Sequence, residues 1–354
     1  MTTPAELTWT LPHVVAGVMV LSLNVYVLLG GADFGGGVWD FFARGEQRDA
    51  QRALIADAIG PIWEANHVWL ILVVVLLFSC FPKAFAFLAT ELHVPLTVML
   101  VGVVLRGSAF TFRTYDSKQD TVQRRWGRIF SVASLLTPIV LGLCLGAVSS
   151  GALPMRSPRE AATLSFQARF IDPWSASPFP WAVGLLTLLL FAFLAASYLT
   201  VEAPEGELRH VFRLRALQLQ GALLLTALAT LVVARVENPL LFAGLTNGRT
   251  ALTMHAVTAC AAVASIWALS TRRFKIARLA AAAQATFILW GWAWTQYPWL
   301  IPPDRTITVL AAPRITLLLI LGALGAGTVI LLPSFVYLFR VFKRGETVFG
   351  GDAP

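Results

Sequence analysis

The sequence predicts an all-α integral membrane protein with about nine transmembrane helices. Of its 354 residues, 57% are hydrophobic and only 13% are charged, whereas a soluble domain carries about 25% charged residues. Apolar stretches of 18 or more residues recur along the whole chain, and each can cross the hydrocarbon core of a bilayer as a helix. The alternation typical of barrel strands, over segments of about ten residues, is absent.

The predicted spans follow one another from the N-terminus to the C-terminus. The first apolar run lacks a basic leader segment, so we interpret it as a span rather than as a cleavable signal peptide. No loop is long enough for a second domain, so residues 1–354 form one transmembrane domain. The predicted spans are residues 12–33, 55–79, 84–106, 129–149, 180–200, 216–235, 250–270, 277–297 and 315–339.

The connections between these spans predict the orientation of the chain. Of the 27 Lys and Arg residues, 18 follow the first, third, fifth and seventh spans or lie in the C-terminal tail, and 8 lie on the other side. Cytoplasmic loops carry the positive excess, so we expect the N-terminus outside and the C-terminus in the cytoplasm. Because these basic residues sit in short loops, the net charge of +8 does not indicate a nucleic-acid-binding protein.

Several kinds of site are not supported by the sequence. Cys80, Cys144 and Cys260 are widely separated and odd in number, which argues against a disulfide framework or a metal site. The chain contains no phosphate-binding loop, dinucleotide fingerprint, zinc-protease motif or serine-hydrolase motif. We therefore expect neither a metal ion nor a catalytic residue in this chain.

Polar residues in the second span form the main candidate site. Asp57, Gly60, Glu64 and His67 are spaced by 3, 4 and 3 residues, which places them on one face of a single helix. At 1.5 Å per residue, Asp57 lies roughly 8 Å and Glu64 roughly 18 Å from the cytoplasmic end. Carboxylates inside a membrane mark ion or proton pathways by default, so this stripe predicts a proton path toward the middle of the membrane.

Asp33 is expected near the cytoplasmic end of the first span, at a depth similar to that of Asp57. It lies within Gly30–Gly37, whose glycines permit close helix contact or an irregular helix end. The alternatives are that Asp33 only terminates its helix, that Asp57 sits among the lipid headgroups, and that Glu64 makes a structural hydrogen bond. For His67, hydrogen-bonded packing is an alternative to haem ligation.

Two further groups of residues lie in the outer half of the predicted bundle. Glu91 and His93, in the third span, are candidates for a polar path or a subunit contact. Trp290, Trp292 and Trp294, in the eighth span, belong either to an interfacial belt or to a surface that stacks on a quinone ring.

Three segments of the chain resemble subunit II of the cytochrome bd family of quinol oxidases. The first is Gly31-Ala32-Asp33-Phe34-Gly35-Gly36-Gly37, and the second is Ile59-Gly60-Pro61-Ile62-Trp63-Glu64-Ala65-Asn66-His67-Val68-Trp69-Leu70-Ile71. The third is Ser197-Tyr198-Leu199-Thr200-Val201-Glu202, followed by Leu208, Arg209, Arg213 and Arg215. The chain length, the number of spans and the predicted orientation agree with that family.

This resemblance implies a complex in a prokaryotic cytoplasmic membrane. Its subunit I would carry two b-type haems, one d-type haem and the quinol-oxidising loop, and small single-helix subunits would attach to it. The complex would oxidise ubiquinol or menaquinol and reduce oxygen to water, with protons drawn from the cytoplasm. In the family, the acid at the position of Glu64 belongs to a proton path toward the haems, and some relatives hold a structural quinone in this subunit.

Two other functions remain as alternatives at this point. A proton-coupled secondary transporter also needs acids inside the membrane, but it typically has two related halves. Here the acids inside the membrane cluster in the first three spans. A stand-alone b-type cytochrome needs paired histidines at matching depth, and His13, His67, His93 and His255 offer no clear pair.

Overall fold

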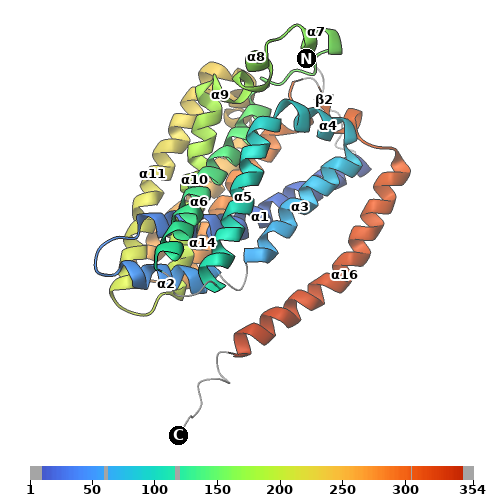
Figure 1. The fold of residues 1–354 in the computed structure, drawn as a ribbon. Coiled ribbons are helices and arrows are strands. Elements are labelled where there is room, and N and C mark those ends of the chain that lie inside the picture. Colours follow the sequence, from blue (N-terminus) through green and yellow to red (C-terminus); the bar gives the residue numbers. More distant parts are fainter. Residues whose placement is uncertain (1–9, 60–62, 116–119, 304, 346–354) are drawn as a thin grey trace.

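The computed structural model describes residues 10–59, 63–115, 120–303 and 305–345. These residues form a helical bundle with one two-stranded hairpin (Figure 1), which confirms the all-helical fold class. The long helices are α1 (Leu11–Phe42), α3 (Trp63–Cys80), α5 (His93–Tyr115), α6 (Asp120–Ser149), α10 (Pro178–Glu202), α11 (Glu207–Glu237), α13 (Arg249–Ser270), α14 (Phe274–Gln296) and α16 (Arg314–Gly345).

Shorter elements close the two ends of the bundle. They are α2 (Arg48–Ile59), α4 (Pro82–Glu91), α7 (Pro158–Ala162), α8 (Phe166–Phe170), α9 (Asp172–Ser175), α12 (Pro239–Thr246), β1 (Trp299–Ile301), β2 (Arg305–Thr306) and α15 (Ile307–Leu310). Figure 1 shows α4, α7, α8 and α9 at one end of the bundle and α2 at the opposite end. We call these the α7 end and the α2 end.

Seven helices in the described part of the chain are long and apolar enough to cross a membrane. The number rises to eight if Asn66–Cys80 and Pro82–Glu91, which are bent by 117°, form one broken span. α14 has 23 residues but is not among them, because Lys275, Arg278 and Gln284 lower its hydropathy. Each predicted span overlaps at least one helix.

The first three predicted spans differ from the helices observed; the third, residues 84–106, is divided between α4 and α5, with Leu92 between them. α1 continues to Phe42 instead of ending near Asp33, because its glycines pack inside a regular helix. The range 55–79 is divided between α2, which ends at Ile59, and α3, which begins at Trp63. Gly60 and Pro61 lie outside the described residues.

Two glycines let α1 sit in the centre of the bundle. A Cβ added at Gly35 would lie 2.0 Å from the carbonyl oxygen of Phe191 on α10. A Cβ added at Gly37 would lie 2.1 Å from Ser134 Oγ on α6. Both distances are far shorter than van der Waals contact, so these positions exclude any side chain. The α1 backbone therefore lies directly against the backbone of α10 and against the Ser134 side chain of α6, and the main hydrophobic core surrounds it.

The last helix stands apart from this core. α16 contacts α1 and α3 only near its beginning, where Ala312 N donates to Cys80 O at 2.8 Å. In Figure 1 the rest of α16 extends away from the bundle. Apolar side chains such as Val329 are exposed along it, as expected for a helix that faces lipid or another subunit.

Candidate functional site

A buried ion pair joins α1 to α5 in the interior of the bundle. Asp33 and Arg106 are each 1% exposed, and Arg106 Nη2 lies 2.5 Å from Asp33 Oδ1. The same nitrogen donates to the Asp33 carbonyl at 3.1 Å, and Arg106 Nε donates to Ser134 Oγ at 3.1 Å. The guanidinium also lies 4.7 Å from the ring centroid of Phe34 and 5.0 Å from that of Phe130. The pair is therefore held by charge, hydrogen bonds and aromatic faces together.

Asp40 forms a second polar layer on the same helix, closer to the α2 end. This carboxylate is 0% exposed; Ser131 Oγ donates to its Oδ2 at 2.8 Å, and Arg52 Nε lies 3.6 Å from its Oδ1. Asp40 follows Asp33 by seven residues, about two turns or 10 Å along one helix face. On α6, Ser131 and Ser134 are one turn apart; Ser131 donates to the Asp40 carboxylate, and Ser134 accepts from Arg106, the partner of Asp33. We call Asp33, Asp40, Arg52, Arg106, Ser131 and Ser134 the polar column.

Several buried atoms beside the polar column have no hydrogen-bond partner among the described residues. They are Asp33 Oδ2, Arg106 Nη1, His67 Nδ1 and both side-chain atoms of Asn66. His67 is half-buried on α3, with its ring centroid 6.2 Å from that of Phe34. Buried polar atoms are nearly always bonded. These atoms are therefore the ones able to bind water or a proton-carrying side chain.

The structure places the predicted residues of the acidic stripe in different surroundings. Asp33 and His67 flank Phe34 and belong to one buried region. Asp57 is exposed on α2, so it does not share the burial of Asp33. Glu64 lies in the first turn of α3, three residues before His67, but its side chain is outside the part of the structure that is described.

Glu91 and His93 lie at the α7 end and contact the short helices there. Arg169 on α8 forms a two-pronged pair with Glu91, with Nη2–Oε1 at 2.6 Å and Nε–Oε2 at 3.3 Å. The hydrogen bonds from Arg169 to Glu91 raise the pKa of Arg169. The ring of His93 packs edge-on against Phe170 at 4.7 Å. In this chain the two residues thus fasten the connection between α6 and α10 to the end of α4.

Of the six residues of the polar column, only Asp33 was predicted from the sequence as a site residue, and the two charged members buried with it, Arg106 and Asp40, were not. Arg106 was placed at a span end, although α5 continues nine residues past it to Tyr115. Asp40 was assigned to a loop because the first span was expected to end at residue 33. The signal that could have found Asp40 is its seven-residue spacing from Asp33, which puts both acids on one face once the helix is continued.

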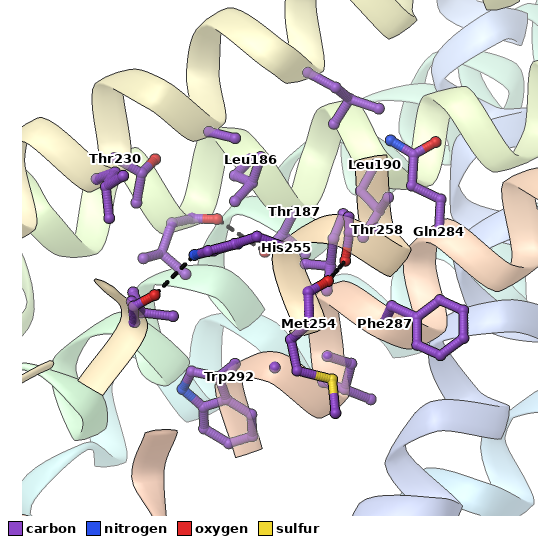
Figure 2. Close-up of a pocket in the computed structure, with 18 of the residues that line it drawn as sticks. Leu186, Thr187, Leu190, Thr230, Met254, His255, Thr258, Gln284, Phe287 and Trp292 are labelled. Carbon is purple, nitrogen blue, oxygen red and sulfur yellow. Dashed lines mark hydrogen bonds between the residues drawn. The ribbon is translucent and has the colours of Figure 1, made fainter. Parts of the chain in front are cut away.

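A separate apolar cavity of about 870 Å³ lies among α10, α11, α13 and α14. Figure 2 shows Leu186, Leu190, Met254 and Phe287 on its wall, together with a few polar side chains. The polar side chains include Thr187, Thr230, His255, Thr258, Gln220, Gln284 and Trp292. The volume falls in the range of about 300–1,000 Å³ that is typical of small-molecule pockets.

Some of the polar groups that line the cavity are already hydrogen-bonded to other groups of the protein. His255 Nε2 lies 2.8 Å from Leu245 O, and Trp292 Nε1 donates to Ser149 Oγ at 2.7 Å. The side-chain oxygens of Gln220 and Gln284 are buried without a partner among the described residues. The cavity therefore suits a largely apolar ligand with a small polar headgroup. In the described residues, no cluster of His, Cys, Asp and Glu could hold a metal ion.

Comparison with known proteins gives consistent matches along the chain. The family model described as cytochrome bd terminal oxidase subunit II matches residues 11–342. The putative cytochrome bd menaquinol oxidase subunit II of Bacillus subtilis is 24% identical over 329 residues, 91% of this chain and 92% of that relative. The cytochrome bd-I ubiquinol oxidase subunit 2 of Escherichia coli K12 is 24% identical over 183 residues, 52% of this chain and 46% of that relative. A chain from the structure of bd oxidase from Geobacillus thermodenitrificans has the same fold, with a TM-score of 0.75 and 24% identity over 97% of this chain and 100% of that chain.

Proposed function

Because the chain belongs to the subunit II family of cytochrome bd terminal oxidases, we propose that it supports a haem-bearing subunit I and conducts protons toward the haems. It is a subunit of a quinol oxidase that reduces oxygen. A match over residues 11–342 also disfavours a secondary transporter.

The observation that carries the proton-path proposal is the polar column. A buried charge inside a membrane costs several kcal/mol unless it is paired, and here two layers of paired charge follow one face of α1. Asp40 and Arg52 form the layer nearer the α2 end, and Asp33 and Arg106 form the deeper layer. The column therefore offers polar partners to water along about 10 Å of helix.

Within this route the residues have different roles. Asp33 is tied to Arg106, whose charge offsets its own, so this pair orients water and neighbouring side chains. His67, with an unpaired Nδ1, and Glu64, one turn before it on α3, are the groups we assign to carry protons. Asp57, exposed on α2, would collect protons at the surface.

We further propose nine spans, with the α2 end in the cytoplasm of a prokaryotic cell and the α7 end outside. α14 is then a span despite its lower hydropathy, and α3 with α4 is a span whose outer end is bent. The excess of Lys and Arg in the connections at the α2 end supports this orientation. The N-terminus is then outside and the C-terminus inside.

We assign two b-type haems and one d-type haem to subunit I, as membership of the cytochrome bd family implies, and the described contacts of four histidines in this chain are to protein groups. His93 and His255 each bond a backbone carbonyl, and His13 bonds Thr10 Oγ at 2.6 Å. His67 packs among the aromatic rings beside the ion pair. Small single-helix subunits would complete the complex.

The apolar cavity fits a structural quinone. Its wall accommodates an isoprenoid chain, and Gln284 or Trp292 would contact the ring. Thr258→Trp should fill part of the cavity and lower the amount of quinone that copurifies with the complex. Thr253→Trp, on the exposed side of the same helix, is the matched control. Equal quinone content in the two variants would contradict the assignment of a quinone to this cavity.

The test of the proposed function starts from a mild-detergent pull-down of the tagged chain, followed by a reduced-minus-oxidised spectrum. We expect a second large subunit with b- and d-haem bands. In that complex, Glu64→Gln should leave the haem content unchanged and slow oxygen consumption by at least about tenfold, since it removes a proton-transferring group. Normal turnover in a fully haem-loaded variant would exclude Glu64 from the route.

A further inference from the structure

The turn between α13 and α14 carries basic side chains that the proton path and the cavity do not use. Arg272, Arg273 and Lys275 are all exposed. Nearby Arg278 is paired with Glu202 at 3.4 Å. Across the described part of the chain, by contrast, no carboxylate forms an ion pair with Arg272, Arg273 or Lys275. We call residues 271–275 the basic turn.

The backbone of the basic turn is unusual for the residue that it carries. Arg273 N donates to Ala268 O at 2.8 Å, and Arg272 N donates to Leu269 O at 3.4 Å. These bonds form the helix-ending motif whose left-handed position normally holds glycine. Here Arg272 occupies that position with a φ of 59°, and among the described residues it is the one non-glycine residue with positive φ. A side chain therefore stands where glycine would be less strained, which points to a use for that side chain.

The surroundings hold the turn in place at the edge of the apolar surface. Arg213 on α11 donates from Nε to Leu269 O at 2.6 Å, which fixes the end of α13 to its neighbour. The Arg273 guanidinium lies 4.8 Å from the ring centroid of Trp267, a residue that is 46% exposed. Tryptophan prefers the membrane–water interface, so the basic turn stands at headgroup level.

Apolar side chains continue from the turn along both helices. Ile266 on α13 and Ile276 and Leu279 on α14 are 42%, 43% and 69% exposed. A soluble phosphate ion would gain no binding energy from these apolar side chains. A phospholipid would place its acyl chains on them and its phosphate at the turn.

We propose that the basic turn binds the headgroup of an anionic phospholipid in the cytoplasmic leaflet. Arg272 and Lys275 donate to the phosphate, while Arg273 lies against Trp267 and adds positive charge. The assignment to the cytoplasmic leaflet rests on the orientation proposed above, whereas the headgroup chemistry does not.

The test measures binding of phosphatidylglycerol to the detergent-purified holo complex by native mass spectrometry. Arg272→Gly suits the left-handed backbone, so the fold should be retained. We expect each basic side chain removed from the turn to weaken phosphatidylglycerol binding about fivefold, cumulatively in Arg272→Gly/Arg273→Gln/Lys275→Gln. Arg249→Gln, at the opposite end of α13 and also exposed, is the matched control and should bind like the unaltered protein.

Three results would overturn the proposal. They are unchanged phosphatidylglycerol binding in the triple variant, equal binding of phosphatidylcholine, and displacement of the lipid by inorganic phosphate at constant ionic strength. Oxygen consumption by the same samples tests the oxidase function separately, because Arg272→Gly should leave it unchanged in detergent. Loss of lipid binding with normal turnover therefore supports the lipid site alone.

Discussion

Neutralising Asp33 should destabilise the protein strongly, because it leaves the Arg106 charge buried without compensation. Both side chains are 1% exposed, and the contact between Nη2 and Oδ1 is 2.5 Å. Asp33→Asn keeps the shape of the side chain and the bond from Arg106 to the backbone carbonyl, so it tests charge rather than packing. Removing one partner of a buried ion pair costs about 3–5 kcal/mol.

A double-mutant cycle separates the pair from its surroundings. Arg106→Met removes the other charge and leaves Ser134 bonded to the Phe130 carbonyl at 2.7 Å. Replacing both charges with neutral groups is often nearly neutral in energy. The double variant should therefore be more stable than the sum of the single effects predicts, by about 2–4 kcal/mol.

Thermal unfolding of the purified holo complex, followed by haem absorbance and tryptophan fluorescence, measures these differences. For Asp33→Asn we expect a fall in the unfolding temperature on the order of 10 °C. Asp57→Asn is the control, since Asp57 is exposed on α2. The reasoning is refuted if Asp33→Asn unfolds at the same temperature as Asp57→Asn. It is also refuted if the loss of stability in the double variant equals the sum of the losses in the two single variants.

Two more outcomes follow from contacts elsewhere in the chain. Gly35→Ala should prevent assembly, because its Cβ would lie 2.0 Å from Phe191 O, while Gly17→Ala, with nothing within 4 Å, should assemble normally; equal yields on size-exclusion chromatography would contradict the close packing of α1. The backbone and hydroxyl of Ser157 donate to Glu160 and lower its pKa, and this bond caps α7. A lowered carboxyl pKa stabilises the folded state above the unfolded value, and that stability is lost as the pH falls through the lowered pKa. Hydrogen-exchange protection at residues 159–162, relative to the intrinsic rate at each pH, should therefore fall below about pH 4, and protection equal to that of Glu160→Gln at every pH would count against it.

The membrane class and the approximate positions of the helices could be predicted because they depend on local composition. A run of apolar residues determines burial in lipid whatever its neighbours are. The break between α3 and α4 falls at Phe81, directly before Pro82, where proline disfavours helix in the preceding residue, but the bond from Ala312 N to Cys80 O is a tertiary contact. That contact joins segments more than two hundred residues apart, so no local pattern in the sequence contains it.

The polar column was only partly predictable for the same reason. Asp33 was predicted as a site residue because burying an acid in an apolar span costs free energy. Its partner Arg106 is 73 residues away, and only the packing of α1 against α5 brings the two together. Glu64 and His67 were grouped with Asp57 on the assumption of one continuous helix, but Asp57 is exposed on α2, whereas His67 is half-buried on α3.

α1 gives the bundle two chemically different sides. Asp40 accepts from Ser131 on α6 and Asp33 pairs with Arg106 on α5, whereas Leu23 and Val27 belong to the wall of the apolar cavity. The close contacts at Gly35 and Gly37 hold this one helix against α10 and α6 together. Leu23 and Val27 precede Asp33 by ten and six residues, so the cavity and the ion pairs use different parts of α1. A larger residue at Gly35 or Gly37 would collide with Phe191 on α10 or Ser134 on α6 and would move α1 away from the partners of its buried acids, whose burial would then be costly.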